Sequence, residues 1–132
     1  MNQISSPFPS LLFRFRGIRT VIYDVRTYTC RPGTLKRHLA LYAEHGFDTQ
    51  RRYLGEPLAY LQTETGNVNS YTHIWVYADV ADRAAKRMAL QRDPAWVEYL
   101  DKSSSAAYLV SQDTRLMVPT PFFKSPLSAD MV

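Results

Sequence analysis

The sequence of 132 residues has little cysteine and no long hydrophobic run. Its single thiol, Cys30, has no partner within the chain, so an internal disulfide framework is excluded. A chain with one cysteine suits a reducing compartment, and we expect the protein to be cytoplasmic. No stretch approaches the roughly 18 to 20 consecutive apolar residues that a spanning helix requires. The sequence therefore predicts no membrane span.

Histidines are also few, and they are scattered at His38, His45 and His73. No group of cysteines and histidines has the spacing of a metal site. We therefore expect neither a metal ion nor a bound cofactor. Because the histidines share no site, the role of each one is interpreted from its own neighbours.

The formal net charge of +4 is concentrated at the N-terminus, where residues 1–20 contain three arginines and no acidic residue. The rest of the chain therefore carries a net charge of only +1. Because a nucleic-acid-binding domain presents a concentrated basic face, we expect no nucleic-acid partner. We interpret residues 1–19 as an N-terminal extension, although a segment with serine and arginine but no acid also resembles an organelle presequence.

The remaining sequence has enough apolar residues, 45% of the chain, to build one core. Periodicity and turn residues predict strands over 20–29, 58–65, 71–78 and within 106–118, and helices over 34–45, from Asp79 and from Asp93. Asp79 and Asp93 are suitable N-cap residues. Lys86 and Arg87 fall late in their helix, where the helix dipole favours cations.

This order of elements predicts an α+β domain with the ferredoxin-like βαββαβ fold, a four-stranded antiparallel sheet with the helices on one face. We expect the domain to cover residues 20–123 and an irregular tail to cover 124–132. Prolines at 119, 121 and 126 support the end of regular structure there.

The strand over 71–78 has one large amphipathic face and one small aliphatic face, with Ile74, Val76 and Ala78 on the latter. We expect the helices to cover the small face, together with Val21, Tyr23 and Val25 of the first strand. Arg26, Tyr28, His73 and Trp75 would then lie on the open face of the sheet. An aromatic patch of this size rarely faces water on a monomer. The pattern therefore predicts a homodimer packed sheet to sheet, with an inter-sheet cavity for a small organic molecule.

Four segments resemble the NIPSNAP family in consecutive order: VRTYTCRPG at 25–33, YLQTETGNVNSYTHIWVYADVADR at 60–83, DPAW at 93–96 and SQDTRLMVPTPFF at 111–123. The resemblance covers residues 21–123. It implies a dimeric α/β barrel built from two ferredoxin-like domains. It implies no established set of catalytic residues.

His73 is the candidate catalytic residue, because its intrinsic pKa lies near neutrality. It can act as an acid or base or contact a ligand. Two other interpretations stay open: a haem ligand, as histidines are in some related dimeric barrels, and a histidine whose hydrogen bonds are satisfied within the dimer interface.

The candidate ligand-binding residues are Arg26, Tyr28, Tyr60, His73 and Trp75. The planar fork of Arg26 suits a carboxylate ligand, but a salt bridge to Asp24 or Glu64 explains it equally well. The aromatic residues either line a cavity or fill a core or an interface.

Three functions remain open from the sequence. The first is binding of a small organic molecule in the cavity. The second is a cofactor-independent monooxygenase or isomerase, by analogy with other dimeric α/β barrels. The third is a non-enzymatic interaction or adaptor module, for which the helix surfaces or the proline-containing tail would matter.

Overall fold

The computed structural model describes residues 21–132, so the predicted extension over 1–19 lies outside the described residues. The elements follow the predicted order with one helix added, α4, which was not predicted as a separate element. They are β1 (Ile22–Cys30), α3 (Leu35–His45), α4 (Phe47–Leu54), β2 (Ala59–Gln62), β3 (Ser70–Tyr77), α5 (Val80–Gln91), α6 (Pro94–Ala106), β4 (Leu109–Met117) and a short 3₁₀ turn η1 (Ala129–Met131). Each crossover from one strand to the next carries a pair of helices.

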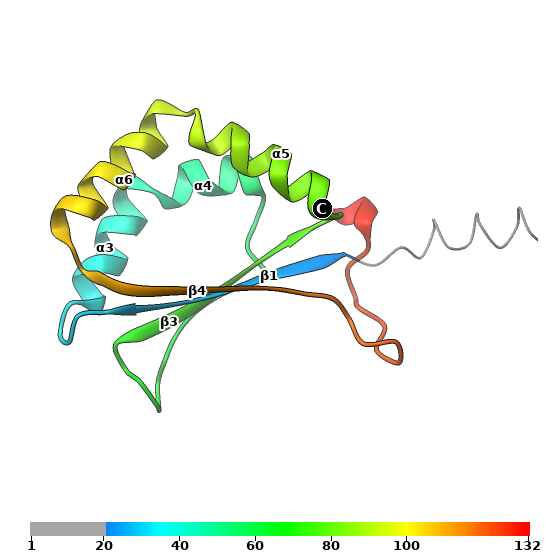
Figure 1. Ribbon diagram of the computed structural model, residues 1–132, viewed down its shortest axis with the longest axis horizontal. Helices are drawn as coiled ribbons and strands as arrows, with labels where there is room; N and C mark the ends of the chain where they lie inside the picture. Colours follow the sequence, from blue (N-terminus) through cyan, green and yellow to red (C-terminus); the bar gives the residue numbers. More distant parts are fainter. Residues whose placement is uncertain (1–20) are drawn as a thin grey trace, which may run out of the picture.

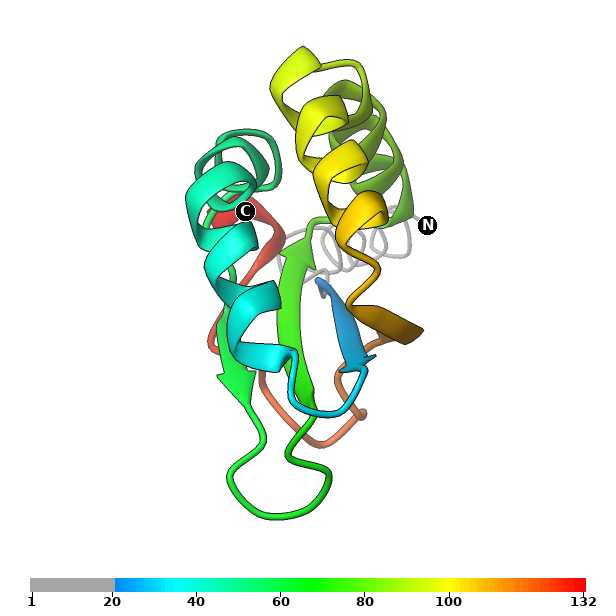
Figure 2. The ribbon, with the colours of Figure 1, turned by 90° about the vertical axis from the view of Figure 1, so that its left-hand side faces the viewer.

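The four strands form one antiparallel sheet in the order β2-β3-β1-β4. All four helices arch over one face of this sheet (Figures 1 and 2). The predicted ferredoxin-like α+β fold is therefore confirmed.

Two aspartates begin the second pair of helices as predicted. Asp79 accepts a hydrogen bond from the backbone N–H of Asp82 at 2.8 Å, which caps α5. Asp93 accepts one from the N–H of Ala95 at 2.7 Å, and Pro94 occupies the first turn of α6. Because these caps fix where α5 and α6 begin, they also fix which side chains turn toward the sheet.

The first pair of helices is joined at Gly46, where α3 ends and α4 begins. A Cβ atom at this position would lie 3.0 Å from the ring of Tyr42 and 3.1 Å from the ring of Tyr99. The two tyrosines therefore pack against bare backbone. The φ of Gly46 is −121°, which any residue can adopt. Glycine is required here because a side chain would stand too close to the two tyrosine rings.

The helices cover the face of the sheet opposite to the one predicted. Arg26 pairs with His73 across β1 and β3, and Asp24 pairs with Trp75. These residues face the helices, and the core joins Ile22, Trp75 and Tyr77 of the sheet to Tyr42, Leu54, Leu90, Trp96 and Tyr99 of the helices.

The prediction was wrong because it weighed side-chain size and polarity without pairing the charges. The large aromatic face buries more apolar area against the helices than the small aliphatic face would. The charges on that face are compensated: Asp24, 0% exposed, receives hydrogen bonds from Arg26 at 3.0 Å and Arg83 at 2.8 Å. Because Asp24 and Arg26 are buried as an ion pair, their charges do not require them to lie on the open face of the sheet.

The open face instead carries the aliphatic and small polar residues of β1 and β3. Val25 lies opposite Ile74, and Thr27 lies opposite Thr72, with their hydroxyls 2.9 Å apart. The C-terminal tail returns to one end of the sheet (Figure 1), where the hydroxyls of Tyr23 and Ser125 form a hydrogen bond. The edge strand β4 is exposed along nearly its whole length.

Candidate functional site

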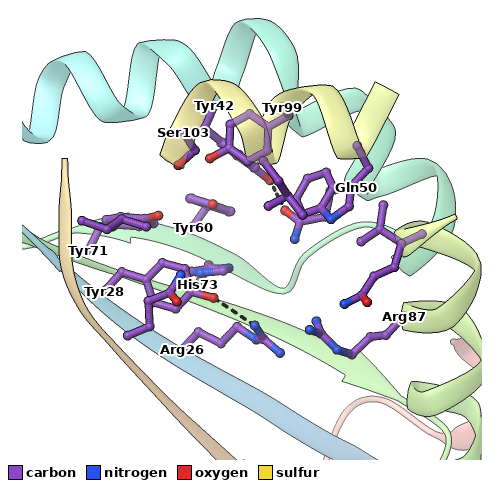
Figure 3. Close-up of a pocket in the computed structure, with 16 residues that line it drawn as sticks. Arg26, Tyr28, Tyr42, Gln50, Tyr60, Tyr71, His73, Arg87, Tyr99 and Ser103 are labelled. Atoms are coloured by element: carbon purple, nitrogen blue, oxygen red, sulfur yellow. Dashed lines mark hydrogen bonds between the residues drawn. The ribbon is translucent and has the colours of Figure 1, made fainter. Parts of the chain in front are cut away.

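A cavity of about 190 Å³ lies between the sheet and the arch of helices (Figure 3). The sheet contributes Arg26, Tyr28, Tyr60, Tyr71, His73, Leu109 and Gln112, and the helices contribute Tyr42, Gln50, Arg87, Leu90, Gln91, Trp96, Tyr99, Leu100 and Ser103. Four predicted ligand-binding residues, those at 26, 28, 60 and 73, thus come together. The cavity is formed within one chain, so the predicted placement of these residues between two sheets was wrong.

Tyr60 forms the central wall of the cavity. Its ring stacks on His73 at 4.7 Å between centroids and on Tyr42 at 5.1 Å, with Tyr71 at 5.8 Å on the sheet side. Burial raises the pKa of Tyr60 and of Tyr71, so both phenols stay neutral. The wall is therefore a continuous set of aromatic faces with no charge of its own.

The hydrogen bond between Trp75 and His73 fixes the state of the imidazole. The indole Nε1–H of Trp75 lies 2.8 Å from Nδ1 of His73. Because an indole nitrogen only donates, Nδ1 must accept. The proton of a neutral His73 then sits on Nε2, and the network assigns the Nε2–H tautomer.

His73 stays neutral far below physiological pH. Burial and the positive charge of Arg26 lower its pKa to about 3. Within residues 21–132 its Nε2 has no hydrogen-bond partner, although the side chain is only 2% exposed. His73 is therefore a fixed hydrogen-bond donor. It has no free lone pair at neutral pH, as a general base or a haem ligand would require.

Arg26 forms the salt bridge to Asp24 that was one of its two interpretations. The Nε and Nη2 atoms of Arg26 donate to the Asp24 carboxylate at 3.0 and 3.2 Å, and Nη1 donates to the Tyr28 hydroxyl at 2.9 Å. Burial opposes ionisation of Asp24, but hydrogen bonds from Arg26 and Arg83 outweigh it and lower the pKa of this carboxyl. Glu64 takes no part in this network. The ion pair holds the Arg26 fork in place at the floor of the cavity.

Trp75 is not among the described residues that line the cavity, although the sequence predicted it there. It is 1% exposed and acts through its hydrogen bond to His73. Trp75 is thus a positioning residue. Cys30 is buried, and burial raises the pKa of its thiol.

Sequence patterns did not predict the cavity residues that the helices contribute, notably Tyr42, Gln50, Arg87 and Tyr99 (Figure 3). Arg87 was attributed to the helix dipole. A signal was available, because Arg83, Arg87 and Leu90 are spaced i, i+4 and i+7 and so share one helix face with a core residue.

The part of the chain that the structure describes lacks two features. Over residues 21–132, no three histidine, cysteine or acidic side chains are grouped so that they could hold a metal ion. In the same part of the chain, no helix has both the length and the apolar character needed to cross a membrane.

Comparison with known proteins places the chain in a family. The NIPSNAP family model matches residues 23–124. A NipSnap homolog of Dictyostelium discoideum is 31% identical over 98 residues, which is 74% of this chain but only 42% of that protein. The chain therefore spans less than half of that relative.

Solved structures agree. The crystal structure of a NIPSNAP family protein from Agrobacterium tumefaciens has a TM-score of 0.72 and 32% identity, covering 81% of this chain and 93% of that one. An antibiotic biosynthesis monooxygenase shares the fold at a TM-score of 0.54 and 17% identity, covering 76% of this chain and 99% of that one. The cavity described above thus belongs to a ferredoxin-like domain, and the chain is a member of the NIPSNAP family.

Proposed function

We propose that this protein binds a small organic molecule with a single planar ring in the cavity between its sheet and its helices. The observation that carries the proposal is the buried Nε2–H of His73, which has no partner among residues 21–132 and stands in an aromatic wall. An unpaired buried donor costs about 1–3 kcal/mol, and a ligand oxygen would remove that cost.

The size of the cavity supports a ligand with one ring. A dry apolar cavity of about 150 Å³ holds benzene. The cavity of about 190 Å³ found here therefore suits one ring with a small polar substituent. The aromatic side chains that line the cavity, Tyr60 among them, offer the ring apolar contacts.

Binding is better supported than proton-transfer catalysis. A cofactor-independent monooxygenase or isomerase needs a group that takes a proton from its substrate. The described lining contains no carboxylate, His73 holds its proton on Nε2, and burial raises the pKa of Tyr99 to about 12. None of these groups is a base at neutral pH.

Filling the cavity is the direct test of this proposal. Ser103, on the cavity side of α6, is replaced by phenylalanine, and exposed Ser104 receives the same change as a control. Single-ring compounds are screened by their effect on the melting temperature. A ligand at a hundred times its Kd should raise the wild-type Tm by on the order of 10 °C. The shift should persist in Ser104→Phe and disappear in Ser103→Phe. Equal shifts in both variants would place the ligand elsewhere.

We further propose that two copies of the chain pair through the open face of the sheet. Support comes from Val25 and Ile74, an aliphatic cross-strand pair that no helix covers, and from β4, whose side chains are exposed on both faces. A patch of this kind is better buried than hydrated.

Light scattering during size-exclusion chromatography measures this association. The wild-type chain should elute with twice the mass of one chain. Val25→Glu places a charge in the middle of the patch and should give a single-chain mass, whereas Ala84→Glu on the exposed side of α5 should not. A wild-type chain that elutes as one copy at micromolar concentration contradicts the pairing.

A further inference from the structure

The positive charges around the cavity outnumber the negative ones. Arg26 and Arg83 both donate to a single carboxylate, that of Asp24. Arg87, one turn further along α5, makes no hydrogen bond or ion pair with any side chain of residues 21–132. Three guanidinium groups therefore share one counter-charge.

The unmatched charge is directed at the cavity. Arg26 rises from β1 and Arg87 descends from α5, and their guanidinium groups point toward one another at one end of the lining (Figure 3). No acidic residue lies among the described residues that line it. Burial and the charge of Arg26 lower the pKa of Arg87, although a guanidinium stays protonated at neutral pH. A cation held in this way is stabilised by an anion placed between the two arginines.

Two other polar groups of the cavity, Gln50 and His73, also present donors. The side-chain carbonyl of Gln50 accepts a hydrogen bond from the Tyr42 hydroxyl, which leaves the amide NH₂ of Gln50 as its available group. His73 offers only Nε2–H, as its tautomer requires. A ligand that satisfies these groups must present oxygen acceptors rather than donors.

Building on the binding function proposed above, we infer that the ligand is an aromatic carboxylate with one ring, whose carboxylate lies between Arg26 and Arg87 while the ring packs against Tyr60. Arg87 can present its planar fork to the two oxygens of a carboxylate, and Nη1 and Nη2 of Arg26 each keep one N–H besides those donated to Tyr28 and Asp24. One ring and one carboxylate also fit the cavity of about 190 Å³. Arg87 is then the residue that selects an anion over a neutral ring.

Calorimetric titration with sodium benzoate and with benzamide tests the inference on the full chain. The two compounds have nearly the same shape, but only benzoate is charged. Benzoate should bind at least tenfold more tightly than benzamide, because hydrogen bonds to a charged group are the stronger class. Arg87→Gln should weaken benzoate binding by about 10- to 100-fold and leave benzamide binding within about twofold.

Two further variants guard against a folding artefact. Arg92→Gln removes an exposed arginine at the end of the same helix and should bind benzoate like the wild-type chain. Arg87→Lys keeps the charge without the fork and should recover part of the lost affinity. Melting temperatures of all variants report whether the fold is intact.

The outcomes separate this inference from the proposed function. Equal binding of benzoate and benzamide, both blocked by Ser103→Phe, would overturn the preference for an anion and leave the cavity as a binding site. Benzoate binding that is indifferent to Arg87→Gln would overturn the role of this arginine. Failure of both compounds to bind would overturn the single-ring site itself, and the inference with it.

Discussion

Asp24→Asn is expected to lower the free energy of unfolding by about 3–5 kcal/mol, the usual cost of removing one partner from a buried ion pair. Asp24 is the only carboxylate that contacts Arg26 and Arg83 among the described residues. Asparagine keeps the shape of the side chain but removes its charge, so the buried guanidinium of Arg26 loses its counter-ion. Urea unfolding at neutral pH measures the effect.

The neighbouring strand provides a matched control. Asp113 and Arg115 on β4 repeat the i, i+2 spacing of Asp24 and Arg26, with an N–O distance of 3.4 Å, but their side chains are 65% and 71% exposed. Asp113→Asn should cost less than about 1 kcal/mol, as exposed pairs do. If the two substitutions lowered the free energy of unfolding by similar amounts, burial would not be what determines how much the Asp24 ion pair stabilises the fold.

Acid is expected to destabilise the fold well before its carboxylates are protonated. The pKa of His73 is about 3 in the folded chain against 6.5 when unfolded, and burial also lowers the pKa of His38. Between these values the unfolded state binds more protons, so stability is full above pH 6.5 and falls as the pH drops toward 3. Each buried histidine contributes up to about 1.4 kcal/mol per pH unit. Unfolding at pH 7 and pH 4.5 should therefore differ by several kcal/mol.

His73→Gln isolates the contribution of one histidine. Glutamine retains an oxygen that can accept from the Trp75 indole, but it does not titrate. The variant should lose about 1.4 kcal/mol of the dependence per pH unit. A slope that is unaffected by His73→Gln contradicts the low pKa of this residue.

The positions of the strands and helices were predictable from the sequence because local signals determine them. Asp79 and Asp93 cap α5 and α6 as expected, and the turn around Gly66 joins β2 to β3. The face of the sheet that the helices cover was not predictable in this way. It depends on Arg83, 59 residues away from Asp24 in the chain, which compensates the charge that made this face look exposed.

The candidate site was predictable only on its sheet side. Arg26 and His73 lie opposite one another in β1 and β3, so strand alternation alone groups them. Gln50 and Arg87 join them through the way the helix pairs cross the sheet, which no local pattern encodes. Single-residue reasoning also left an acid/base role for His73 open, because it did not include the indole of Trp75 that occupies Nδ1.

The joint at Gly46 has a consequence for the cavity beneath it. Tyr42 and Tyr99 line the cavity from the helix side (Figure 3), and the Gly46 backbone approaches both rings so closely that an added methyl would stand 3.0–3.1 Å from them. Any side chain at this position must push the rings by a few tenths of an ångström, and both rings line the cavity. The absence of a side chain at Gly46, which does not itself line the cavity, thus helps to set the space available inside the cavity. The size of ligand that fits consequently depends on the residue at position 46, which lies outside the lining, as well as on the residues that a ligand touches.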